Sequence, residues 1–183
     1  MKKIITMLIT AILVIVGCED NIVNSDNEVK IVNNDSEVNT FVSVNVKDGL
    51  TDHFSFETNT GDTSGTSAWD IAFTALKWSP APGAPDVWDP FITANEDISV
   101  VRVNVDGLSD IVDIPESELF TTNFSTFEDG WYETDDNHIV NPLDYVYIVN
   151  TEDGKYPAFE VVNYYDDEGN SGVFTIEWKY LAE

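Results

Sequence analysis

Apolar and polar side chains alternate with a period of two over much of the chain. Near the start of this region Val42, Val44 and Val46 alternate with Ser43 and Asn45. A period of two places successive side chains on opposite faces of a β-strand, whereas an amphipathic helix repeats apolar residues at i, i+3, i+4 and i+7. Beyond the first eighteen residues no window sustains the helical spacing. The alternation therefore restricts the chain to strands that bury one face.

The same alternation predicts further strands, which are separated by turn signals. The predicted strands centre on residues 54–56, 69–73, 101–105, 145–149, 158–165 and 174–180. Segments rich in Gly, Pro, Asn and Asp lie between them, and these residue types favour turns. They cover residues 59–67, 79–85, 152–155 and 166–172. One helical turn is expected over residues 115–120. We predict an all-β fold, an antiparallel sandwich or a strongly bent sheet.

The beginning of the chain has the features of an export signal. Lys2 and Lys3 precede an uncharged apolar run over residues 4–16. This run is too short for a membrane-spanning helix, which needs about 20 apolar residues. Residues 15–18, Ile-Val-Gly-Cys, resemble the lipobox of bacterial lipoproteins, in which the cysteine receives a diacylglyceryl group. We therefore expect cleavage before Cys18 and a lipid anchor on that cysteine, which attaches the chain to a membrane.

Three segments follow from this interpretation. Residues 1–17 are the predicted lipoprotein signal peptide, residues 18–36 a flexible acidic tether rich in Asn, Asp and Ser, and residues 37–183 a single β domain. Because Cys18 is the sole cysteine, the domain is expected to rely on its core rather than on disulfides. The acidic residues after Cys18 resemble the tag that directs some lipoproteins to the cell surface, so we expect an outer-membrane, surface-exposed location.

The charge of the chain limits its partners. It has 8 Lys and Arg residues against 34 Asp and Glu residues, a formal net charge of −26. Such a surface repels phosphate backbones and anionic lipid headgroups, which argues against nucleic-acid binding. The excess of carboxylates is explained either by solubility alone or by a cation ligand. Neither a nucleophile motif nor paired histidines are recognisable, so we do not expect an enzyme.

Two blocks of the sequence resemble the HmuY-like family of haem-binding bacterial lipoproteins. The first comprises His-Phe-Ser-Phe-Glu at residues 53–57 and Ala-Trp-Asp-Ile-Ala-Phe at residues 68–73. The second runs from residue 130 to residue 180 and includes Gly-Trp-Tyr, His-Ile-Val-Asn-Pro and a C-terminal hairpin. The resemblance implies an all-β fold, a lipid anchor, and a cleft in which two axial side chains hold haem. It also implies delivery of haem to an outer-membrane receptor.

The sequence offers few axial ligands for haem iron, which takes His, Met, Cys thiolate or Tyr. Met1 and Met7 lie in the predicted signal peptide and Cys18 is the predicted lipid anchor. His53 and His138 are therefore the candidate haem-binding residues, and several strand tyrosines are a further source of a phenolate. Alternatively, His53 is an ordinary strand residue and His138 an ordinary turn residue, and the spacing does not show whether the two meet.

Two other ligand classes remain open as alternatives to haem. Calcium binds carboxylate and carbonyl oxygens, and the turn over residues 166–170 is rich in acidic side chains, although its spacing fits no EF-hand. Carbohydrate is the second alternative, because Trp78, Trp88 and Trp131 are candidates for an aromatic platform on the surface. Core packing is the more usual role for such tryptophans, and a solvated hairpin turn is the more usual explanation of the acidic cluster.

Overall fold

The computed structural model describes residues 37–111, 113–127 and 130–181. The predicted signal peptide, the predicted anchor Cys18 and the predicted tether lie outside the described residues. In the described ranges no helix is long and apolar enough to cross a membrane. These ranges form eleven strands and four short 3-10 helices, which agrees with the all-β prediction.

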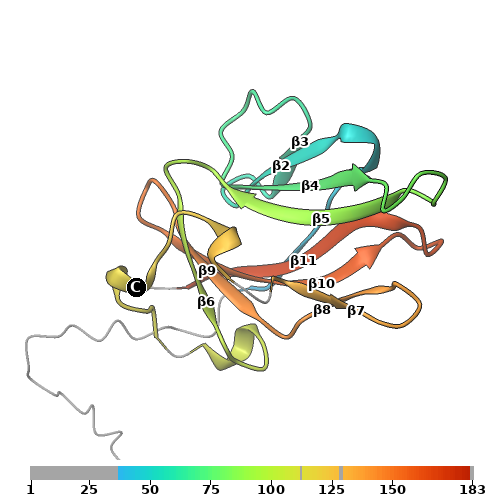
Figure 1. The fold of residues 1–183 in the computed structure, drawn as a ribbon. Coiled ribbons are helices and arrows are strands. Elements are labelled where there is room, and N and C mark those ends of the chain that lie inside the picture. Colours follow the sequence, from blue (N-terminus) through green and yellow to red (C-terminus); the bar gives the residue numbers. More distant parts are fainter. Residues whose placement is uncertain (1–36, 112, 128–129, 182–183) are drawn as a thin grey trace, which may run out of the picture.

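Two antiparallel sheets make up the body of the fold (Figure 1). The larger sheet contains, in spatial order, β1 (Asn39–Val42), β11 (Ser171–Leu181), β10 (Tyr156–Tyr165), β9 (Val146–Asn150) and β6 (Ser99–Val103). The smaller sheet contains β3 (Thr60–Asp62), β2 (Thr51–Ser55), β4 (Ile71–Trp78) and β5 (Val87–Ala94). A separate hairpin is formed by β7 (Tyr132–Thr134) and β8 (Val140–Pro142). The 3-10 helices are η1 (Lys47–Gly49), η2 (Leu108–Asp110), η3 (Ser117–Leu119) and η4 (Phe124–Thr126).

The two sheets pack face to face through aromatic side chains. Phe41 of β1 lies 4.2 Å from Phe54 of β2, measured between ring centroids. Phe73 of β4 lies 4.9 Å from Phe174 of β11. Burying a phenylalanine side chain stabilises a fold by about 1.5–3 kcal/mol, so this layer of rings is the main source of cohesion between the sheets. The predicted antiparallel sandwich is confirmed.

A second, smaller core covers the outer face of the larger sheet. Leu108 of η2 and Ile111 pack there against Val146 and Ile148 of β9 and Leu181 of β11. The segment that supplies this cover contains η2 and η3, and η3 lies within the helical turn predicted over residues 115–120. The larger sheet is therefore buried on both faces over β9 and the first half of β10, up to Phe159.

The first predicted strand is wrong in both its length and its buried face. β1 ends at Val42, and Val42 and Val44 are 56% and 44% exposed, whereas Phe41 and Val46 are buried. Phe41, the larger apolar side chain, occupies the core face, and the two-residue period then directs Val42 outward. After Val42 the chain still follows β11, to which the N–H groups of Ser43 and Val46 donate, but it no longer forms a regular strand. The alternation of valines therefore does not mark one continuous strand.

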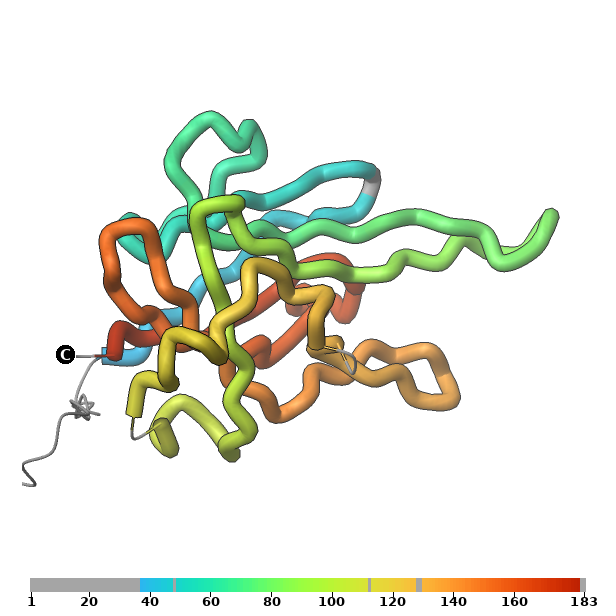
Figure 2. The backbone as a smooth tube through the Cα atoms, turned by 60° about the vertical axis from the view of Figure 1, so that its left-hand side comes forward, coloured from blue at the N-terminus to red at the C-terminus, as the bar shows by residue number. Residues whose placement is uncertain are grey.

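Three hairpins project from the same end of the molecule (Figures 1 and 2). They are the β4–β5 hairpin with its tip at residues 79–86, the β7–β8 hairpin with its tip at residues 135–139, and the β10–β11 hairpin with its tip at residues 166–170. The first and last tips lie in the predicted turns over residues 79–85 and 166–172, and the tip of the β7–β8 hairpin holds His138, which was expected in a turn. Together the three hairpins form the walls of the candidate site.

Candidate ligand-binding groove

A groove of about 630 Å³ lies between the three projecting hairpins. Its aromatic lining comprises Trp78 and Trp88 from the β4–β5 hairpin, Tyr132 from β7, and Tyr164 and Tyr165 from β10. Small-molecule sites usually measure about 300–1,000 Å³ and combine apolar walls with a few polar groups. The groove has the size and the lining of such a site, and it suits a flat, mostly apolar ligand.

Few charged or strongly polar side chains reach the groove. Lys47 and Ser171 lie side by side there, and the Lys47 ammonium donates a hydrogen bond to the Ser171 hydroxyl. Asp86 and Asp89 line the β4–β5 wall. Asp86 forms an ion pair with Lys77 at 2.7 Å, which holds the pKa of that carboxyl below its usual value. The groove therefore carries both signs of charge, at different walls.

His138 lies at the tip of the β7–β8 hairpin and lines the groove. Its φ is +62°, in the left-handed region that favours glycine. The Asp135 carboxylate holds the tip by accepting hydrogen bonds from the N–H groups of Asn137 and Ile139, both at 2.9 Å. The bond from Ile139 is the largest of the causes that keep the pKa of Asp135 below its usual value.

A left-handed conformation costs a residue with a side chain about 1–2 kcal/mol relative to a right-handed one. The strain at His138 is stored in a turn that glycine or asparagine would adopt more easily. Strained backbone of this kind clusters at functional sites. His138 is therefore a candidate for direct contact with a ligand.

Tyr165 fixes the β7–β8 hairpin to the larger sheet. Its hydroxyl accepts a hydrogen bond from the Val140 backbone N–H at 2.8 Å. Val140 is two residues beyond His138, so this bond sets the position of the histidine relative to β10. The β7–β8 hairpin, which carries His138, is consequently fixed to the larger sheet by Tyr165, and Tyr165 itself lines the groove.

The second candidate histidine lies elsewhere. His53 is on β2, where its Nδ1 is 3.0 Å from the carbonyl oxygen of Asp62. Its ring meets the edge of Trp69 at 4.9 Å, and Gly65 lies so close that an added Cβ would collide with the ring. These contacts tie the loop after β3 to β2. The structure does not bring His53 and His138 into one site.

Tyr164 is an unusual residue of the groove. Its side chain is 1% exposed, and among the described residues its hydroxyl has no hydrogen-bond partner. Burial raises the pKa of the Tyr164 phenol above its usual value. An unsatisfied buried hydroxyl destabilises a fold by about 1–3 kcal/mol.

Tyr164→Phe is therefore expected to leave the free energy of unfolding unchanged or to raise it, because no hydrogen bond is lost. Tyr165→Phe is the matched control. It removes the acceptor of the Val140 N–H and is expected to cost about 1 kcal/mol. Urea denaturation of both variants measures the difference. If Tyr164→Phe destabilised the protein as much as Tyr165→Phe, the Tyr164 hydroxyl would have to be hydrogen-bonded.

Of the three candidate platform tryptophans, two lie in the groove and one does not. Trp78, at 46% exposed, and Trp88 line the groove. Trp131 is buried in the core 5.0 Å from Phe174, and its Nε1–H donates to the Pro90 carbonyl at 3.3 Å. The hypothesis of a surface role is wrong for Trp131, because its ring packs in the core between β5 and β11.

The acidic turn considered for calcium uses its carboxylate to close the turn. Asp166 Oδ1 accepts hydrogen bonds from the N–H groups of Glu168 at 3.0 Å and Asn170 at 2.7 Å. The Asn170 side-chain amide donates to the other oxygen at 3.0 Å, and it is the largest cause of the lowered pKa of Asp166. In the part of the chain that the structure describes, no three His, Cys, Asp or Glu side chains are grouped to hold a metal ion.

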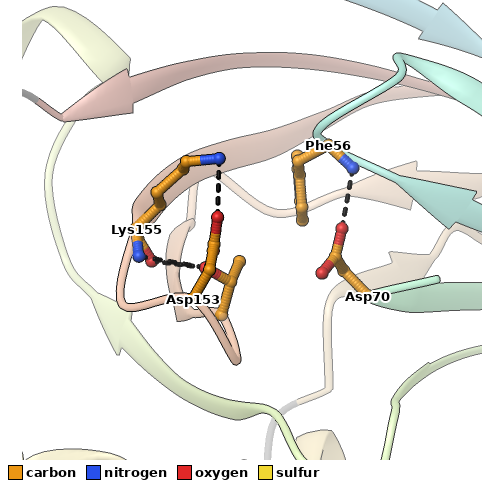
Figure 3. Close-up of polar contacts among 5 residues, drawn as sticks. Phe56, Asp70, Asp153 and Lys155 are labelled. Carbon is orange, nitrogen blue, oxygen red and sulfur yellow. Dashed lines mark hydrogen bonds and ion pairs between the residues drawn. The ribbon is translucent and has the colours of Figure 1, made fainter. Parts of the chain in front are cut away.

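A second, acidic pocket of about 190 Å³ lies at the opposite end of the sandwich. Two of its carboxylates, those of Asp70 and Asp153, are engaged within the protein (Figure 3). Asp70 accepts a hydrogen bond from the Phe56 N–H at 2.8 Å, and Asp153 forms an ion pair with Lys155 at 2.6 Å. This pocket is small and far from the projecting hairpins, so the larger groove is the better candidate site.

Sequence reasoning did not single out the polar part of the groove. Lys47 and Ser171 are 124 residues apart, and neither belongs to a motif. Asp86 and Asp89 follow the proline-rich turn and resemble the many other acidic residues of the chain. The signal that could have found the groove was the occurrence of tryptophans, tyrosines and His138 beside predicted turns.

Comparison with known proteins gives matches among solved structures. Neither a protein-family model nor a curated protein matches the chain. A protein from Bacteroides vulgatus, assigned as HmuY-like and haem-binding, superposes with a TM-score of 0.55 at 17% identity over 85% of this chain and 98% of that one. A Bacteroides fragilis protein assigned as a lipoprotein gives a TM-score of 0.52 at 14% identity, over 84% and 94% of the two chains.

The structure of the apo form of the HmuY analogue of Tannerella forsythia resembles this chain to the same extent. Its TM-score is 0.52 at 11% identity, and the match covers 86% of this chain and all of that one. At such identities the likeness reports on the fold and not on the ligand. The resemblance noted in the sequence is thereby confirmed at the level of architecture: the chain has the HmuY-like fold.

Proposed function

We propose that this chain is a lipid-anchored bacterial surface protein that binds haem in the groove, with His138 as an axial ligand of the iron. The observation that carries the proposal is the position of His138, an imidazole on strained backbone that lines an aromatic groove. Imidazole is a common axial ligand of haem iron.

The lining of the groove fits the chemistry of a porphyrin. A porphyrin is a flat apolar ring, and Trp78, Trp88 and Tyr132 offer aromatic faces of the same kind. The volume of about 630 Å³ lies in the range of sites for ligands of this size. His138, at the tip of the β7–β8 hairpin, lines the groove together with residues of the β4–β5 and β10–β11 hairpins. Haem bound between the hairpins would therefore contact both the aromatic side chains and the imidazole.

The comparisons support the same ligand class. The Bacteroides vulgatus neighbour is assigned as haem-binding and the Bacteroides fragilis neighbour as a lipoprotein. The predicted signal peptide and the predicted anchor at Cys18 are consistent with a lipoprotein at the outer membrane, exposed at the cell surface. In this proposal haem is cargo for an outer-membrane receptor, and the protein is a binding protein rather than an enzyme.

We propose ligation by one histidine rather than by two. His53 is engaged with Asp62 and Trp69 on β2 and is not part of the groove. The full sequence contains two histidines, so His138 has no second imidazole to pair with. A single histidine is expected to give ferric haem a high-spin spectrum, in contrast to the low-spin spectrum of a bis-histidine complex.

Titration of the purified protein with haem, followed by visible absorption, tests the proposal. We expect a saturable Soret shift with one equivalent of haem and a high-spin spectrum. Carbohydrate is the second candidate, because exposed Trp78 and half-buried Trp88 line the same groove. A thermal shift with oligosaccharides, together with no Soret change at micromolar haem, would favour a sugar ligand and contradict the haem proposal.

A further inference from the structure

We infer that an apolar pocket beside the groove receives one edge of the porphyrin, the edge that carries the vinyl groups of haem. This inference rests on the proposed function and adds a determinant of specificity to it. It gives the ligand an orientation, in which the vinyl edge is buried between β5 and β7 and the propionate edge faces solvent.

The apolar pocket measures about 500 Å³ and is lined by residues of β5, η4, β7 and β9. β5 contributes Phe91 and Ile92. Three further lining rings, those of Phe124, Phe127 and Tyr147, contact one another at centroid distances of 5.4, 5.7 and 6.2 Å. Removing apolar ligand groups from water into such a lining is favourable. The pocket therefore suits hydrocarbon substituents.

The apolar pocket and the groove are adjacent along the same two strands. Along β5, residues 87–89 line the groove and residues 90–93 line the apolar pocket. Tyr132 and Thr134 of β7 line both spaces. A flat ligand in the groove can therefore extend between β5 and β7 into the apolar pocket without crossing a strand.

Buried side chains fix the junction between the two spaces. The Nε1–H of Trp131 donates to the Pro90 carbonyl at 3.3 Å, which ties β5 to the residue before β7. The ring of Tyr132 packs on that of Trp131 with centroids 4.8 Å apart, and Trp131 in turn lies 5.0 Å from Phe174 of β11. The space between β5 and β7 is consequently preformed, so a ligand need not order it on binding.

Charge decides which edge of the porphyrin enters the apolar pocket. Of the described residues that line it, Glu133 is the charged one. Arg102 stacks on Phe127 at 5.2 Å and on Tyr145 at 4.2 Å and does not line the pocket. A propionate placed there would lose its hydration without contacting a cation, which is costly. Vinyl groups lose no hydrogen bonds on burial, so the vinyl edge enters and the propionates stay in water.

The test compares three iron porphyrins that differ where haem carries its two vinyl groups. Deuterohaem has hydrogens at these positions, and iron coproporphyrin has two further propionates. We expect the wild-type protein to bind haem about tenfold more tightly than deuterohaem, since partial burial of the vinyl groups contributes a factor of this order. Iron coproporphyrin is expected to bind at least about 100-fold more weakly than haem, because its extra carboxylates are excluded from the pocket. Absorption titrations give the three dissociation constants.

Phe91→Ala tests the pocket itself, because Phe91 lines it and is 41% exposed, so that folding does not depend on the ring. The variant is expected to bind haem about fivefold more weakly and deuterohaem within about twofold of the wild-type protein, which reduces the preference for haem. Leu76→Ala is the matched control. Leu76 is 59% exposed on β4 and lines neither the groove nor the apolar pocket, so all three affinities should change by less than about twofold.

The outcomes separate this inference from the proposed function. Wild-type protein that bound deuterohaem or iron coproporphyrin as tightly as haem would overturn the inference and leave haem binding intact. A preference for haem over deuterohaem that Phe91→Ala left unchanged would overturn it in the same way. Failure of the wild-type protein to bind any of the three porphyrins would instead refute the proposed function, and the inference with it.

Discussion

Replacing His138 with glycine is expected to weaken haem binding by at least about 100-fold. Loss of a residue that merely supports a metal ligand already costs about 10–100-fold in affinity, and the ligand itself should cost more. Glycine is the informative substitution because it adopts the φ of +62° without strain. The variant should therefore be at least as stable as the wild-type protein while losing its ligand, which separates binding from folding. Titration with haem and thermal denaturation measure the two effects.

Two controls sharpen the experiment on His138. His53→Ala removes the other histidine of the chain and is expected to retain the haem affinity and the high-spin spectrum, because His53 lies on β2 among Asp62, Gly65 and Trp69. Free imidazole added to His138→Gly should restore part of the affinity by entering the space left by the ring. Haem binding that survived His138→Gly, or that disappeared in His53→Ala, would rule out His138 as the axial ligand.

Regular parts of the fold were predictable from the sequence because burial on one face imposes a period of two. In β11 the predicted core residues Phe174 and Ile176 are fully buried, and the turn predicted over residues 152–155 joins β9 to β10. The acidic connection over residues 166–172 was also predicted, and β11 begins within it. These segments combine a strong local period with turn residues, so local sequence and tertiary structure agree.

β5 was missed because its sequence breaks the pattern. Pro90 lies in the middle of this strand, and proline lacks the N–H that a strand interior usually donates. The sheet tolerates it because β5 is an edge strand with β4 on one side. Whether a strand occupies an edge is a property of the assembled sheet, so the sequence of residues 87–94 alone could not reveal it.

The groove was out of reach of sequence reasoning for a similar reason. His138 lies in the turn where the sequence placed it, and Trp78 and Trp88, which were considered for a ligand surface, line the groove. What could not be predicted is that three hairpins from distant parts of the chain project side by side (Figure 2). The separation of His53 from His138 follows from the same arrangement, since one lies on a sheet and the other at a hairpin tip.

Phe174→Ala is expected to lower the free energy of unfolding by about 3–5 kcal/mol, the usual range for phenylalanine to alanine in a core. Phe174 is fully buried at the junction of the two sheets. Its ring centroid lies 4.9 Å from that of Phe73 and 5.0 Å from those of Trp131 and Tyr164. These neighbours belong to different elements and cannot all move inward, so most of the cavity should remain. Val162→Ala on the exposed face of β10 is the control, expected within about 0.5 kcal/mol of the wild-type protein.

The same substitution should also reach the groove, because Tyr164 both packs on Phe174 and lines the site. Removing the phenylalanine ring frees Tyr164 to tilt toward the core, and the wall beside Tyr165 would then lose its shape. We expect haem affinity to fall several-fold in Phe174→Ala under conditions where the protein is still folded. Measuring urea denaturation and haem titration on one preparation distinguishes this coupling from simple loss of folded protein. A stable Phe174→Ala variant, or one that is destabilised yet binds haem like the wild-type protein, would show that the core and the groove wall are not packed as one unit.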